Sequence, residues 1–245
     1  MNPGISLTPF DGGRIFTRAV RFLGPDGAEE LRDMADPNHC YLVRHPQGLL
    51  MWDTGLSDAI AALPGHTLYR GRFRFVVETP LADQLARRGL RPEDVDLLAF
   101  SHLQIDHAGN CGLFQNARVL LQKAEWERAF ESGAEAHGYV PQDIDILRQR
   151  SVTQLEGDLD VFGDGQVLIL SAPGHTPGHQ VLFVDLPETG PVLLSGDLYY
   201  ATRDPQEGWL PAWNHDIEET RRTVEKMQHL AAETGARWII NHNPE

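Results

Sequence analysis

The stretch Ser101-His102-Leu103-Gln104-Ile105-Asp106-His107 brings two imidazoles and a carboxylate together in one short segment. Imidazole nitrogens and carboxylate oxygens are the usual protein ligands of zinc, iron and manganese. The apolar run Leu97–Phe100 comes just before it, so we expect these ligands on a strand-to-helix turn. If the chain stays extended there, residues 102 and 104 point the same way. Residues 106 and 107 then reach a neighbouring position, so one short loop can serve two metal ions.

The other candidate ligands also follow short apolar runs with strand character. His175 comes after Val167–Leu170, Asp197 after Val192–Leu194, and His242 after Trp238–Ile240. Loops at one edge of a rigid scaffold are where sites are usually built, so this recurrence favours one shared site. A histidine without such a motif is more often a surface residue. We therefore expect surface positions for His39, His45, His66, His137, His215 and His229.

Composition narrows the class of protein. The chain has 245 residues, 41% of them hydrophobic, as in ordinary globular proteins. Its net charge of -14 comes from 21 basic and 35 acidic residues, without a basic stripe, so we expect no nucleic-acid partner. A solvated surface accounts for the acidity, and two bound divalent cations would offset about four of those charges. The two cysteines, Cys40 and Cys111, exclude a disulfide framework and a cysteine-rich zinc module.

The start of the chain and its apolar runs bear on location. MNPGISLTPFDGG lacks a basic leader and an apolar core of signal-peptide length. No run approaches the roughly 18 apolar residues of a membrane span. The sequence therefore predicts a cytoplasmic protein without a membrane partner. No linker or low-complexity tract divides it, so we expect one domain over residues 1–245.

Hydrophobic patterning predicts alternating strands and helices. The expected strands are Ile15–Leu23, Cys40–Arg44, Leu49–Trp52, Leu97–Phe100, Val119–Leu121, Val167–Leu170, Val181–Val184, Val192–Leu194 and Trp238–Ile240. The expected helices are Pro80 to Gly89 with Thr79 as cap, Ala124–Ser132, Pro141–Arg150 and Asp216–Thr234. This order favours an α/β arrangement in which two sheets lie between helical layers.

Longer motifs carry a family resemblance. SHLQIDHAGN resembles the His-x-His-x-Asp-His motif of the metallo-β-lactamase superfamily. PGHTPGH with His175, SGDLYY with Asp197 and IINHNPE with His242 follow in order, and WDTG with Asp53 lies upstream. Within the superfamily, the chain is most similar to the N-acyl-homoserine-lactone lactonases. This likeness rests on the segments HPQGLLMWDTGL, DHAGN and PGHTPGHQ and on Tyr200.

The resemblance implies an αββα metallo-β-lactamase sandwich with two divalent metal ions, zinc first, with iron, manganese or cobalt as alternatives. One ion would take His102, residue 104 and His175, and the other Asp106, His107 and His242, with Asp197 bridging them. A metal-bound hydroxide would open a small-molecule lactone or related ester. Asp106 would pass a proton to the leaving alkoxide, and Tyr200 would donate to the substrate carbonyl. Asp53 would orient the metal loop.

Gln104 departs from the motif, which has histidine there. Its neutral amide oxygen suits harder metals than imidazole nitrogen does. Three outcomes stay open: Gln104 ligates weakly, or the first ion keeps His102, His175 and Asp197 alone, or the first position is empty. The alternatives in function are a metal-poor ligand-binding relative, another ester, thioester or phosphoester hydrolase, and a redox diiron protein.

Several residues have two interpretations. A group of large apolar residues either lines an apolar substrate cleft or packs in loops: Trp209, Leu210, Trp213, Phe73 and Phe75. His179 either supports a ligand or is structural, and Tyr199 either replaces Tyr200 as donor or packs. For Cys111 we expect a small buried residue. A homodimer is left open.

Overall fold

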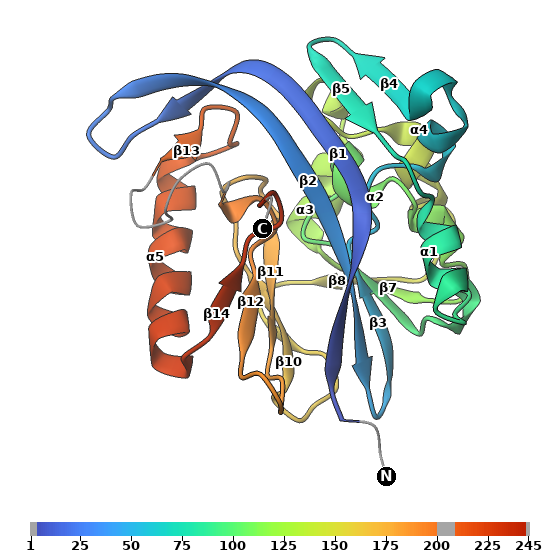
Figure 1. Cartoon of the computed structure of the whole chain (residues 1–245). Helices are drawn as coiled ribbons and strands as arrows, with labels where there is room; N and C mark the ends of the chain where they lie inside the picture. The colour runs from blue at the N-terminus through green and yellow to red at the C-terminus, as the bar shows by residue number, and fades with distance from the viewer. Residues whose placement is uncertain (1–3, 200–208, 244–245) are drawn as a thin grey trace.

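Two β-sheets packed face to face make up the body of the molecule. The computed structural model describes residues 4–199 and 209–243 (Figure 1). The larger sheet runs in the order β4-β5-β1-β2-β3-β6-β7-β8, with β13 paired to β1. Its strands are β1 (Ser6–Leu23), β2 (Glu29–His45), β3 (Gly48–Trp52), β4 (Thr67–Arg70), β5 (Phe73–Val76), β6 (Leu97–Ala99), β7 (Arg118–Gln122), β8 (Val152–Leu155) and β13 (Leu210–Pro211).

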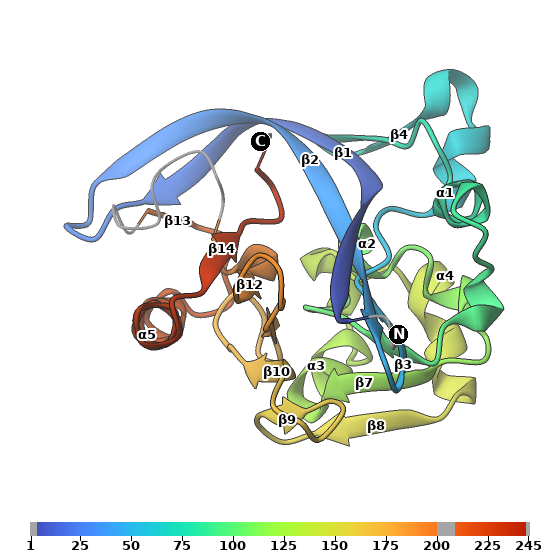
Figure 2. The same ribbon diagram turned by 60° about the horizontal axis from the view of Figure 1, so that its bottom comes forward.

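The second sheet has the order β14-β12-β11-β10-β9. Its strands are β9 (Leu159–Asp160), β10 (Val167–Ser171), β11 (Gln180–Val184), β12 (Val192–Leu194) and β14 (Arg237–Ile239). The helices are α1 (Leu81–Arg87), α2 (Ile105–Ala108), α3 (Lys123–Ala129), α4 (Pro141–Ile144) and α5 (Ile217–Thr234). Helix α5 covers this second sheet, and the other helices lie on the far side of the larger one (Figure 2).

Alternation along the strands produces these layers. On β2, Cys40 and Leu42 belong to the core beneath α1 and α3, whereas Tyr41 and Val43 belong to the core between the sheets. Successive strand residues point to opposite faces, so a strand buried on both faces is apolar throughout. Val224 and Met227 of α5 complete a third core on the outer face of the second sheet. The expected αββα sandwich is confirmed.

The boundaries show where local patterning is a weak guide. Each expected strand coincides with an observed one, although Phe100 and Ile240 lie just beyond β6 and β14. The expected helix Pro141–Arg150 is an α-turn, α4, that continues as a 3₁₀ segment, Asp145–Gln149. Asp216 caps α5 by accepting the amide of Glu219 at 2.8 Å.

The hairpin of β1 and β2 is longer than the sequence predicts. Only Ile15–Leu23 and Cys40–Arg44 were expected, but the two strands pair from Ser6 with Arg44 to Leu23 with Glu29. The Glu29–Asn38 half is rich in charge and partly exposed, so it lacks the apolar run on which the strand prediction relied. This ribbon arches across the molecule toward β13 and α5 (Figure 1).

Two further expectations can be compared with the fold. The surface position expected for His45 is wrong: it is 5% exposed, its Nε2 lies 2.9 Å from Asp164 Oδ2, and its ring stacks on Phe162. Cys111 is buried, as expected, and its thiol donates to the carbonyl of Asp143. Within the described ranges, none of the helices combines the length and the apolar character that crossing a bilayer needs.

Candidate metal centre

The candidate ligands meet where the strands of both sheets end. His102 follows β6, His175 follows β10 and His242 follows β14, while Asp197 lies in the short 3₁₀ turn Gly196–Leu198 after β12. All are at most 2% exposed. Strand ends at one edge of a sandwich lie side by side, so residues far apart in sequence converge there.

The ligand atoms form two groups that share Asp197. One group is Asp106, His107, Asp197 and His242, and the other is His102, His175 and Asp197; within each, the atoms lie within 4.8 Å of one another. Asp197 Oδ1 lies 3.0 Å from Nε2 of His107 and of His242. Its other oxygen, Oδ2, lies 3.5 Å from Nε2 of His175. One carboxylate thus faces both groups, as a bridging ligand must. We call the group of His102, His175 and Asp197 the first position, and the group of Asp106, His107, Asp197 and His242 the second position.

The Nδ1 atoms show which way each ring presents its lone pair. His107 Nδ1 lies 3.1 Å from Asp53 Oδ2, His175 Nδ1 2.9 Å from Asn214 Oδ1, and His242 Nδ1 3.0 Å from the carbonyl of Pro37. These partners accept, so Nδ1 carries a proton and the Nε2 side of each ring points inward, toward the candidate ligand group. His102 follows the same pattern: its Nδ1 lies 3.1 Å from Ser101 Oγ, which itself donates to Asp53.

A divalent cation fits this donor set. Nε2 of His107 is buried and makes no hydrogen bond within the described part of the chain, although two carboxylates lie close to it. Burial opposes charge on His107, but Asp106 and Asp197 outweigh it and hold the pKa of the ring well above its usual range. Inward lone pairs, two carboxylates and a buried nitrogen without a hydrogen bond are what a bound cation would satisfy.

The loop that carries these ligands is held from beneath by Asp53. This residue is 1% exposed, and its carboxylate accepts from the amide of Ser101 at 2.6 Å as well as from the ring of His107. Its φ of 57° lies in the left-handed region, which costs a residue with a side chain of order 1 kcal/mol or more. The expected orienting role of Asp53 agrees with these contacts.

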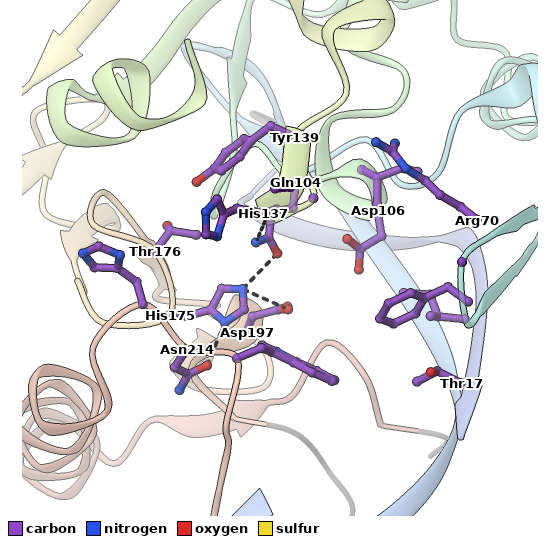
Figure 3. A pocket seen from close by; sticks show the side chains of 18 of the residues that line it. Thr17, Arg70, Gln104, Asp106, His137, Tyr139, His175, Thr176, Asp197 and Asn214 are labelled. Atoms are coloured by element: carbon purple, nitrogen blue, oxygen red, sulfur yellow. Dashed lines mark hydrogen bonds and ion pairs between the residues drawn. The ribbon is translucent and has the colours of Figure 1, made fainter. Parts of the chain in front are cut away.

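Gln104 has a fixed orientation beside the first position. Its Nε2 donates to the carbonyl of His137 at 2.8 Å, so Oε1 must face the other way. Oε1 lies 3.1 Å from Nε2 of His102 and 3.1 Å from Nε2 of His175. Figure 3 shows the amide held between His137 and His175. The amide oxygen and the two ring nitrogens therefore converge on one point.

Glu125 of α3 was missed by the sequence reasoning. It is 0% exposed and accepts three hydrogen bonds: from the amide of Leu103 at 2.9 Å, the hydroxyl of Tyr139 at 3.0 Å and the hydroxyl of Thr176 at 2.6 Å. It thereby joins the loops on both sides of the first position. No local signal marks it, because the segment around it reads as an ordinary helix.

A cavity of about 690 Å³ opens over the two positions. Phe73, Phe75 and Trp213 line it, in agreement with one of their two interpretations. Trp209 instead packs with Val20, Phe22 and Met34. Such a volume, with an apolar wall and polar groups at its base, is typical of small-molecule sites.

The remaining candidates have separate outcomes. His179 accepts from the amide of Asp197 at 3.1 Å, and its Nδ1 lies 3.1 Å from the carbonyl of Ala172, so the ring helps to position Asp197. Tyr199 is buried against Trp238 and accepts from Gln228, which is a packing role. Tyr200 lies outside the described residues.

Removal of metal is expected to leave a pH-sensitive apoprotein. Burial opposes charge on His242, but Asp197 and Asp106 raise its pKa from 6.5 to about 9. A raised pKa stabilises the folded state below 6.5, and this contribution is lost as pH rises through 9, by at most about 3 kcal/mol. Chelated protein should therefore melt at lower temperature at pH 9 than at pH 6.5. An equal or higher melting temperature at pH 9 would contradict this.

Comparisons with known proteins agree with this geometry. Residues 34–234 match the family model described as "Metallo-beta-lactamase superfamily". The chain is 33% identical over 226 residues to N-acyl homoserine lactonase AttM of Azorhizobium caulinodans, covering 87% of this chain and 84% of that one. It is 29% identical over 216 residues to N-acyl homoserine lactonase AiiA of Bacillus thuringiensis subsp. kurstaki, covering 85% and 82%.

Solved structures are similar over nearly the whole chain. An N-acyl homoserine lactone hydrolase with N-hexanoyl-L-homoserine bound at its catalytic metal center has a TM-score of 0.81 and 25% identity, covering 100% of this chain and 95% of that one. AidC, a dizinc quorum-quenching lactonase, has a TM-score of 0.73 at 19% identity, covering 100% and 89%, which shows a shared fold alone.

Proposed function

Because this chain belongs to the metallo-beta-lactamase superfamily and is a metallo-hydrolase, we propose that it opens the lactone ring of N-acyl homoserine lactones. The observation that carries the proposal is the pair of ligand groups around Asp197 at the base of a cavity with an apolar wall. The cavity has room for a lactone and an acyl chain, and Phe73, Phe75 and Trp213 offer that chain an apolar surface.

The proposed second position consists of Asp106, His107, His242 and Asp197, and the first of His102, His175, Asp197 and Gln104. Two divalent ions there, zinc in the first instance, would supply a Lewis acid and an activated water. Asp106 lines the cavity, so its carboxylate can approach a bound lactone, and its role as the group that relays a proton to the leaving alkoxide stays a proposal. For Tyr200, donation to the lactone carbonyl stays a proposal that rests on the family motif.

Gln104 is proposed as a ligand of the first position through Oε1. Its separations of 3.1 Å from two ring nitrogens resemble the 3.0–3.5 Å between ligand atoms at the second position. Two lone pairs at 3.1 Å repel unless a cation or a proton lies between them. Burial holds the pKa of His102 well below its usual range, so that ring is neutral.

Metal analysis of three proteins tests this assignment. Gln104→Leu removes the oxygen and should lower the affinity of the first position for its ion by at least about 10–100-fold. Dialysis against a weak chelator should then leave one metal ion per chain. Gln104→His restores an imidazole and should retain two. If the leucine variant keeps the metal content of the natural protein, Gln104 is not a ligand.

Lactonase activity is tested directly with metal-loaded protein. We expect hydrolysis of N-hexanoyl-homoserine lactone, which is measured by the release of protons from the acid formed. Chelation of the metal should abolish activity, and the return of zinc should restore it. Aryl esters, thioesters and phosphoesters serve as competing substrates. A higher kcat/KM for one of those classes than for every lactone would overturn the proposal, as would full activity in metal-free protein.

A further inference from the structure

Among the described residues, two buried polar side chains in the wall of the cavity each have an oxygen without a hydrogen-bond partner. Thr17 on β1 is 4% exposed and Asp36 on β2 is 6% exposed, and both line the cavity. Within residues 4–199 and 209–243, Thr17 Oγ1 and Asp36 Oδ2 form no hydrogen bond. A buried polar atom left unsatisfied costs about 1–3 kcal/mol, so its retention at a cavity wall calls for an explanation.

Their neighbours show that the fold does not require polar groups there. Asp36 pairs across the strands with Ile15, and Thr17 pairs with Met34, and all four side chains line the cavity. The two polar residues therefore lie on one diagonal of a small patch, and the two apolar residues lie on the other. Ile15 and Met34 are accommodated as apolar residues on the same strands, so the polar diagonal is not a demand of strand pairing.

Asp36 also lies close to the proposed second position. The next residue, Pro37, accepts the Nδ1 proton of His242 through its carbonyl at 3.0 Å. Burial raises the pKa of Asp36, and the charge of His242 opposes that rise. A group bound to Asp36 would thus lie beside the scissile lactone rather than at the far end of an acyl chain. In Figure 3, Thr17 lies on the β1 wall, away from His175.

We propose that Asp36 and Thr17 form a substrate subsite that accepts a hydrogen bond from an N–H or O–H donor close to the scissile carbonyl. This inference rests on the proposed lactonase function and names the substrate feature that the site selects. Asp36 Oδ2 supplies the acceptor, while the hydroxyl of Thr17 can accept or donate. An N-acyl homoserine lactone carries an amide N–H on the carbon next to its lactone carbonyl, and a hydroxylated acyl chain carries an O–H.

The experiment compares matched substrates rather than single rates. The donor-bearing lactone is N-hexanoyl-homoserine lactone, and its partner is the N-methyl amide, which lacks the N–H. A second pair, N-(3-hydroxyhexanoyl)- and N-hexanoyl-homoserine lactone, tests an O–H donor. The variants are Asp36→Leu, Asp36→Asn and Thr17→Val, and the control is Asp33→Asn, on the exposed face of the same strand.

The natural enzyme should prefer the donor-bearing member of one pair in kcat/KM. Asp36→Leu should reduce that preference by about 10–100-fold, because a hydrogen bond to a charged group is lost. Asp36→Asn, which keeps one acceptor oxygen, should recover part of it, and Thr17→Val should cause a smaller loss. Asp33→Asn should leave the ratio unchanged. The pair that responds identifies the donor as amide or hydroxyl. Equal ratios in Asp36→Leu and the natural enzyme for both pairs would overturn the subsite.

Two further measurements separate this subsite from a structural role and from the proposed function. Asp36→Leu should raise the melting temperature, because a buried carboxyl with an unsatisfied oxygen is removed, whereas loss of a structural contact would lower it. Calorimetric binding of ring-opened N-hexanoyl-homoserine and its N-methyl form needs no turnover. If no lactone is opened but binding keeps the donor preference, the lactonase proposal fails and the subsite stands. If neither turnover nor binding occurs, both fail.

Discussion

The Asp197→Asn protein should lose at least about 100-fold in lactone hydrolysis and bind fewer than two metal ions. Among the described residues, Asp197 is the one shared by both candidate ligand groups, with Oδ1 toward His107 and His242 and Oδ2 toward His175. An amide offers a single neutral oxygen, so it cannot serve both positions as a charged bridge. Changes that merely support a ligand already cost about 10–100-fold, and loss of the shared ligand should cost more.

Metal content and kcat should be measured together for this variant. Asp185→Asn is the matched control, because Asp185 is an exposed carboxylate that follows β11 at the opposite edge of the same sheet. It should retain two ions and natural activity. If Asp197→Asn keeps two ions and natural kcat, the shared carboxylate is not a bridging ligand, and the two-ion arrangement proposed here is wrong.

Glu125→Ala should destabilise the protein by about 3–5 kcal/mol and weaken the first metal position. The change leaves the amide of Leu103 and the hydroxyls of Tyr139 and Thr176 without their buried acceptor. Leu103 lies between His102 and Gln104, and Thr176 follows His175, so these ligands should lose their alignment. Chemical denaturation gives the free energy of unfolding, and metal titration gives the loss of affinity.

Glu125→Gln is the matched control for Glu125→Ala, because glutamine keeps the shape of the side chain and one acceptor oxygen. Burial raises the pKa of Glu125, so the ionised carboxylate is disfavoured and a neutral isostere fits its environment. Its carbonyl oxygen can still accept from Leu103 and Tyr139, and the hydroxyl of Thr176 can turn to accept from the new amide. We expect less than about 1.5 kcal/mol of destabilisation and two bound ions. If the alanine variant is as stable as the glutamine variant, Glu125 does not join the loops.

The convergence of the ligands could be predicted because each follows an apolar strand, and strand ends meet at a sheet edge. The supports could not be predicted, because Glu125 and Asn214 act through contacts far apart in sequence. Gln104 shows most clearly what the sequence cannot predict. The sequence shows that this residue carries an amide, but the orientation of the amide depends on its hydrogen bond to the carbonyl of His137. The position of Asp36 depends on the pairing of β1 with the charged half of β2, which lacks a strand pattern.

The candidate ligand histidines come from three separate parts of the fold, and this has a consequence for the integrity of the chain. His242, beyond the last strand, is tied through Pro37 to the N-terminal hairpin, while His107 and His175 belong to the central loops. An ion held among them would act as a cross-link that closes very long chain loops and so disfavours the unfolded state. Both cysteines are buried as free thiols, so they supply no such link. Metal depletion should then release the C-terminal strand first, and hydrogen exchange in β14 would report it.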